Sequence, residues 1–145
     1  MLTIAALPFG MGSKTTRVEY KGKEGMSQHV LAAVDDMFFA SKIRATAEHL
    51  GLDVRFARTA DALVAAARED APALVVVDLH AQRCDPFALA ESFKADAVLR
   101  NIPLIGFFSH VQTALKLRAE AAGFDRVMPR SAFTKHLAEI LQTKY

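Results

Sequence analysis

The chain has 145 residues, of which 52% are hydrophobic and 23% charged, so one compact domain with a real core is expected and two ordinary domains are excluded. The formal net charge of +2 is already reached within the first 25 residues, and the neutral remainder lacks the clustered cations that nucleic-acid binding requires. A single cysteine excludes an internal disulfide, and no apolar run is long enough to span a bilayer, so we expect a cytoplasmic protein without a membrane partner.

Residues 1–26 are expected to form a flexible leader, because glycines and a proline interrupt a short polar stretch that has no sustained period. Met26 offers an alternative start. Residues 10–15 superficially resemble a phosphate-binding loop, but Ser13 stands where that motif needs a glycine before the lysine, and the following residues are a poor helix start. We therefore assign no phosphate site to the leader.

Residues 27–145 alternate short apolar runs with amphipathic segments. In chain order, the pattern predicts a strand at 30–34, a helix at 38–50, a strand at 54–57, a helix at 60–69, a strand at 74–77, a helix at 86–98, a strand at 104–108, a helix at 111–122, a strand at 127–128 and a last helix from 131. Thr59 and Ser131 are predicted to cap helices, and Gly51 and Gly123 to end them. The phenylalanines, among them Phe38, are expected to fill the core.

Five strand–helix units with short loops predict an α/β fold, with a five-stranded parallel sheet covered by helices on both faces, as in flavodoxin-like proteins. In such sheets the ligand site forms at the carboxyl ends of the strands. Cys84 lies in a connecting segment and has no recognisable base beside it in the sequence, so we interpret it as a plain thiol rather than a nucleophile.

Acidic residues follow two of the predicted strands. Asp35 and Asp36 come directly after the first strand, and Asp78 comes directly after the third. Three carboxylates converging on one crevice must recruit a cation or take up protons, and a hard ion such as Mg²⁺ would resolve the conflict. The alternative, in which Asp36 caps a helix and Asp78 merely ends a strand, stays open.

The order and separation of these residues resemble the receiver family of response regulators in two-component signalling, whose fold is a (βα)5 sheet of this kind. An acidic pair follows the first strand as Asp35 and Asp36, and the phosphate-accepting position after the third strand is matched by Asp78. Asp85, seven residues further on, and residues 100–103 before the fourth strand also match. The resemblance covers essentially the whole region after Met26.

The resemblance implies a role for each of these residues. Asp78 would accept phosphate, Asp36 would ligate Mg²⁺ directly, Asp35 would act mostly through water, and the backbone carbonyl of His80 would complete the protein ligands. The imidazoles of His80 and His110 are interpreted as solvated loop side chains, since a metal role for them would need a softer ion than Mg²⁺.

The sequence departs from the family in the region that reads out phosphorylation. The hydroxyl residue that ends the fourth strand in the family falls on Phe108, and Ser109 next to it is a possible substitute. The family's lysine falls on Arg130, and its aromatic switch position falls on Val127. Arg130 can pair with phosphate, but its planar fork does not replace the point charge of a lysine without rearrangement.

We therefore expect a stand-alone receiver-like domain that acts in a phosphorelay. We do not expect this domain to be an enzyme. It would take phosphate from a histidine kinase or phosphotransfer protein and bind a downstream protein through residues 111–142, and homodimerisation is also open. The alternative is a degenerate pseudo-receiver that is never phosphorylated and serves as an interaction or dimerisation module. A flavodoxin-like FMN binder is disfavoured, because no phosphate-cradling loop follows the first strand.

Overall fold

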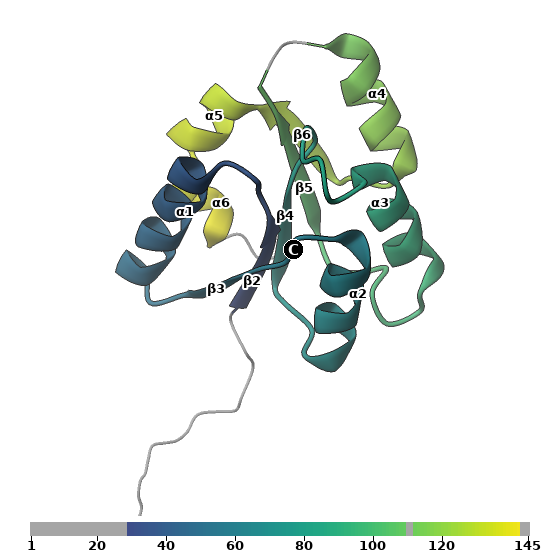
Figure 1. Cartoon of the computed structure of the whole chain (residues 1–145), viewed down its shortest axis with the longest axis horizontal. Helices are drawn as coiled ribbons and strands as arrows, with labels where there is room; N and C mark the ends of the chain where they lie inside the picture. Colours follow the sequence, from purple (N-terminus) through teal and green to yellow (C-terminus); the bar gives the residue numbers. More distant parts are fainter. Residues whose placement is uncertain (1–28, 110–111, 143–145) are drawn as a thin grey trace, which may run out of the picture.

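The computed structural model describes residues 29–109 and 112–142 (Figure 1). The predicted leader, its loop-like motif, His110 and Val111 lie outside these residues, so the predictions made for them stay predictions. In the described part of the chain, no helix is long and apolar enough to cross a membrane.

Five parallel strands form one sheet, and their order across it is β3-β2-β4-β5-β6. The bounds are β2 His29–Ala33, β3 Asp53–Phe56, β4 Leu74–Asp78, β5 Leu104–Phe108 and β6 Arg126–Pro129. Every residue of the three inner strands is buried, whereas the edge strands β3 and β6 are partly exposed. Strands covered on both faces read as continuous apolar runs, which is why the sequence marks the inner strands so clearly.

Helices cover both faces of the sheet (Figure 1). One layer contains α1 (Met37–His49), α5 (Arg130–Lys135) and α6 (Leu137–Leu141), and the other contains α2 (Ala60–Glu69), α3 (Pro86–Ala95) and α4 (Thr113–Ala122). Alternate residues of each strand point to opposite faces and divide the apolar interior into two cores. In β5, Phe108 packs in the core under α2, α3 and α4, and Phe107 packs in the core under α1, α5 and α6. The predicted fold is confirmed.

Several predicted helix ends are also confirmed. The hydroxyl of Thr59 accepts a hydrogen bond from the backbone N–H of Ala62 at 3.0 Å and so caps α2. Gly123 lies directly after α4, and Gly51 lies one residue further from the end of α1, following the C-cap Leu50; the two glycines have positive φ angles of 128° and 73°. That left-handed conformation is open to glycine at little cost, so each glycine allows the chain to leave its helix there.

Three local predictions are wrong. Phe38 is 91% exposed, because it lies in the first turn of α1 on the side away from the sheet, and its neighbour Phe39 fills the core instead. Ser131 caps no helix, since α5 already begins at Arg130 and the last helical region is divided at His136. The helix predicted at 86–98 ends at Ala95, where the Asp96 carboxylate accepts two backbone N–H groups and turns the chain.

Candidate functional site

Four ionisable side chains meet at the carboxyl edge of the sheet. Asp35 and Asp36 follow β2, and Asp78 is the last residue of the neighbouring strand β4. Arg130 comes directly after β6 and opens α5. The parallel sheet therefore collects at one edge residues that lie up to about a hundred positions apart in the sequence.

Asp36 is engaged through both oxygens of its carboxylate. Oδ1 accepts hydrogen bonds from the backbone N–H groups of Phe38 at 2.9 Å and Phe39 at 3.1 Å, which caps α1. Oδ2 accepts a hydrogen bond from Nη2 of Arg130 at 2.9 Å. The hydrogen bond from Arg130 and the capping bonds hold the pKa of Asp36 below its usual range, so this carboxylate is ionised at neutral pH.

Arg130 is fixed by a second contact besides the ion pair. Its guanidinium carbon lies 4.1 Å from the centre of the Phe39 ring, a cation–π arrangement. Phe39 in turn meets Phe107 edge to face, with ring centres 5.0 Å apart. The cation at the acidic edge thus rests on the core beneath α1, and its position is set by packing as well as by charge.

Among the acids of residues 29–109 and 112–142, Asp78 is the most removed from water, with 8% of its surface exposed. Burial raises its pKa, whereas the hydrogen bond from the backbone N–H of His80 to Oδ1 at 2.9 Å lowers it. The nearby charges of His80 and Arg130 also lower the pKa, and that of Asp35 raises it. Burial is the largest of these effects, so Asp78 holds a proton more readily than an exposed aspartate.

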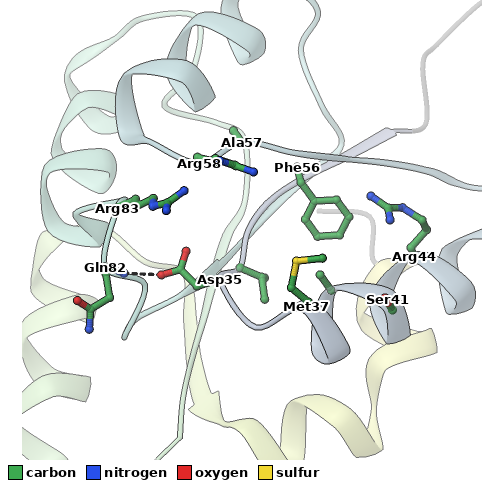
Figure 2. Close-up of a pocket in the computed structure, with 11 residues that line it drawn as sticks. Asp35, Met37, Ser41, Arg44, Phe56, Ala57, Arg58, Gln82 and Arg83 are labelled. Carbon is green, nitrogen blue, oxygen red and sulfur yellow. Dashed lines mark hydrogen bonds between the residues drawn. The ribbon is translucent and has the colours of Figure 1, made fainter.

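Asp35 ties two loops together. Its Oδ2 accepts a hydrogen bond of 2.7 Å from the backbone N–H of Gln82, in the loop between β4 and α3 (Figure 2). This bond joins the segment after β2 to the segment after β4, forty-seven residues later. The carboxylate therefore has a positioning role in the conformation described.

The chemistry of the donor set suits Mg²⁺, and Arg130 lies beside Asp36 as a competing cation. Carboxylate and carbonyl oxygens are the ligands that this ion prefers. Both oxygens of Asp36 accept hydrogen bonds, and within residues 29–109 and 112–142 no three His, Cys, Asp or Glu side chains are grouped as a metal site. In this conformation Arg130 supplies the positive charge beside Asp36. The metal-ligand roles of Asp35, Asp36, Asp78 and His80 stay predictions.

The switch positions are filled by apolar side chains. Phe108 is 4% exposed and Val127 is 8% exposed, and both pack in the core under α2, α3 and α4. Ser109 follows β5 and is exposed. Whether its hydroxyl substitutes for the family's hydroxyl residue stays a prediction.

Two further residues singled out in the sequence have structural roles. The carboxylate of Asp85 caps α3, accepting from the backbone N–H groups of Phe87 at 3.0 Å and Ala88 at 3.2 Å. Cys84 is fully buried, and burial raises the pKa of its thiol to about 11. The thiol is therefore protonated at neutral pH and is a poor nucleophile.

Sequence reasoning missed the ion pair between Arg130 and Asp36, and it missed three arginines beside the acidic edge, Arg44, Arg58 and Arg83. Arg58 lies directly after the predicted second strand, at a position where ligand-binding residues of parallel sheets gather. That placement was a usable signal. The pairing of Arg130 with Asp36 left no such signal in the sequence, because it depends on the directions of the two side chains.

No protein-family model matches the chain, and neither does any curated protein sequence. Solved structures do match. The receiver domain of the sensor histidine kinase PA1611 from Pseudomonas aeruginosa, which has a magnesium ion coordinated in its active site cleft, aligns with a TM-score of 0.70 and 19% identity over 81% of this chain and 96% of that one. The chemotaxis response regulator CheY4 of Vibrio cholerae aligns with a TM-score of 0.70 and 16% identity, over 81% of this chain and 98% of that one.

The chain has the fold of a response-regulator receiver domain. A response regulator in red light signaling of R. palustris gives the same result, with a TM-score of 0.67, 19% identity and coverage of 78% of this chain and 90% of that one. At such identities the likeness concerns the receiver fold itself.

Proposed function

We propose that this chain is a receiver-type signalling module that acts by binding other proteins, and that Arg130 neutralises its acidic edge in the place of a metal ion. The observation that carries the proposal is the 2.9 Å ion pair between Arg130 Nη2 and Asp36 Oδ2. Because Arg130 also rests on the Phe39 ring, a divalent ion would have to displace a cation that is held at two points.

The altered switch positions support the same proposal. A phosphorylation signal needs contacts that differ between the two states of the protein. Phe108 has no hydroxyl to offer a phosphoryl oxygen, and both Phe108 and Val127 are already buried in the core. The usual pair of moving side chains is therefore lacking, and phosphate at Asp78 would change the partner-binding face only modestly.

The partner-binding surface is proposed on α4, β6, α5 and α6, the described part of residues 111–142. Leu117 on α4 is 60% exposed, an apolar side chain available to a partner. A downstream protein would dock on this surface, and a second copy of the chain is the competing occupant. Sedimentation velocity of the isolated chain distinguishes the two, because self-association depends on protein concentration.

A second candidate function is phosphate acceptance at Asp78 from a histidine kinase or phosphotransfer protein, with Mg²⁺ bound at the acidic edge. It is favoured by the position of Asp78 at the end of β4, where the charge of Arg130 is close enough to lower its pKa. A phosphoryl group there would add negative charge and give Arg130 a second anion with which to pair.

Treatment with acetyl phosphate and Mg²⁺ separates the two candidates. If the first is correct, intact-mass measurement will show no phosphoryl adduct on the wild-type chain, and Mg²⁺ will cause no saturable amide shifts at Asp35, Asp36 or Asp78. An adduct that is absent from Asp78→Asn would establish the second candidate instead. Large amide shifts across residues 113–142 with beryllofluoride would show a working switch and refute the first proposal.

Replacement of Arg130 tests the role of the ion pair directly. Arg130→Met removes the charge and frees Oδ2 of Asp36, so the pKa of Asp36 should rise toward its usual range and the affinity for Mg²⁺ should increase. Arg126→Met, at an exposed arginine of β6, is the matched control and should change neither quantity. Carboxyl titration by NMR measures the pKa. An Asp36 pKa that is the same in Arg130→Met as in the wild type would contradict the proposed neutralisation.

A further inference from the structure

A pocket of about 760 Å³ opens beside the acidic edge, between α1 and the loops that follow β3 and β4 (Figure 2). Its volume lies within the range of small-molecule sites in proteins. The switch positions Phe108 and Val127 do not line it, nor does the proposed partner surface on α4, β6, α5 and α6. The pocket is therefore a feature that the proposed function leaves unexplained.

The pocket has two chemically different ends, which Figure 2 shows side by side. At one end the side chains of Arg58 and Arg83 lie above Asp35 in this view. The other end is lined by the ring of Phe56 and the thioether of Met37, and the guanidinium carbon of Arg44 lies 4.9 Å from the ring centre. One end thus offers two cationic forks, and the other offers a thioether and an aromatic ring that also carries the Arg44 guanidinium.

The charge of the pocket is not balanced from within the described residues. Three arginines line it against one carboxylate, Asp35, and within residues 29–109 and 112–142 no salt bridge joins any of the three to an acid. By contrast, Arg55 and Arg68 on neighbouring elements are both paired with aspartates. Met37 is also 79% exposed beside the pocket. Unbalanced cations next to an exposed apolar surface fit a ligand that is anionic at one end and flat at the other.

We propose that this pocket binds a nucleotide, with the phosphate held by Arg58 and Arg83 and the base packed against Phe56 and Met37. The planar guanidinium pairs with phosphate oxygens through two parallel hydrogen bonds, which makes arginine the preferred phosphate ligand. An aromatic ring and a thioether provide contact area for a flat heterocycle. An acidic peptide would satisfy the cationic end but would leave the apolar end unfilled. The site needs no chemistry at Asp78, so it is independent of the proposed function.

Calorimetric titration of the full chain with GMP and AMP tests the proposal, with pyrophosphate and guanosine as probes for the two ends. We expect saturable binding of a nucleotide and amide shifts confined to the residues that line the pocket. Arg58→Gln and Arg83→Gln should each weaken nucleotide binding about tenfold. Phe56→Leu should weaken nucleotide binding while leaving pyrophosphate binding unchanged, which a purely electrostatic surface would not do.

Arg68→Gln is the matched control, because Arg68 is an exposed arginine on α2 that lies outside the pocket. Its nucleotide affinity should equal that of the wild type. Circular dichroism identifies any variant that has failed to fold, and Arg58→Lys and Arg83→Lys keep the charge at positions where glutamine is not tolerated. An equal loss in Arg68→Gln would overturn the proposal, as would the absence of saturable binding. Binding of a glutamate-rich peptide without nucleotide binding would identify a docking site for an acidic protein instead.

Discussion

Asp78 carries its carboxylate into a position where ionisation is costly. Burial is the main reason that its pKa is raised, and the hydrogen bond from His80 together with the charge of Arg130 offsets only part of the effect. A carboxyl group with a raised pKa in the folded state stabilises the protein below its usual pKa range, and this contribution is lost as the pH rises through the folded-state value. At neutral pH the ionised Asp78 therefore lowers the free energy of unfolding.

Replacement of Asp78 by asparagine should stabilise the domain at neutral pH. Asparagine keeps an oxygen that can accept the hydrogen bond from the His80 N–H and removes the buried charge. We expect the melting temperature of Asp78→Asn to exceed that of the wild type by a few degrees at neutral pH, with a smaller difference near pH 4. Thermal melts at both pH values measure this. A less stable variant at neutral pH would mean that attraction to Arg130 outweighs the cost of burial.

The sequence predicted which residues form the acidic edge, but it did not predict the hydrogen bonds and the ion pair that these residues make. Alternating strands and helices sufficed to place Asp35, Asp36 and Asp78 at the same edge, since parallel strands bring their carboxyl ends together. The pairing of Asp36 with Arg130, ninety-four residues away, depends on the rotamers of two side chains. It also depends on Phe39 lying beneath the guanidinium. No pattern along the chain carries that information.

At the scale of single elements, Asp85 caps α3 at the end of a loop that also bounds the pocket. Asp85→Ala should lower the free energy of unfolding by about 1 kcal/mol, because two backbone N–H groups of the first turn lose their acceptor. Asp85→Ser retains a capping oxygen and should restore most of the loss. Urea unfolding of both variants measures the difference. Equal destabilisation by alanine and serine would mean that the carboxylate acts through its charge rather than as a cap.

Some element boundaries were predictable from a local signal, although Ser131 shows that such a signal can mislead. The strand predicted at 104–108 coincides with β5, and the helix predicted at 60–69 coincides with α2, because Pro103 and Thr59 mark their starts. The division between α5 and α6 was not predictable. No glycine or proline stands at His136, and the break accompanies the packing of Phe133 and Leu137 into the same core.

At the scale of the whole molecule, two cores share one sheet. Phe107 is fully buried and lies between Phe39 and Phe133, with ring centres 5.0 and 4.8 Å away. Phe107→Ala should cost about 3 to 5 kcal/mol of unfolding free energy. Leu89→Ala, in the core on the opposite face, should cost about 2 to 5 kcal/mol. Because both cores include residues of the same strands, each variant should still unfold in a single transition by circular dichroism and by fluorescence of an added dye. Two separate transitions would show that the faces unfold independently.

The five strands and both cores are formed by residues 29–142. A chain that begins at Met26 is therefore expected to melt within a few degrees of the full-length chain. Differential scanning calorimetry of the two proteins provides the comparison. A much lower melting temperature for the shorter chain would show that residues 1–25 contribute substantially to stability.

The edges of the sheet have a consequence for the behaviour of the protein at high concentration. A bare strand edge can recruit the edge of another molecule and seed cross-β aggregation. Here both edge strands have only four residues. On β3, Arg55 pairs with Asp53 at 2.9 Å, so a docking strand would meet charged side chains. On β6, Pro129 has no N–H to offer a neighbouring chain. Both edges of the sheet thus discourage the addition of further strands, which favours colloidal stability at high protein concentration.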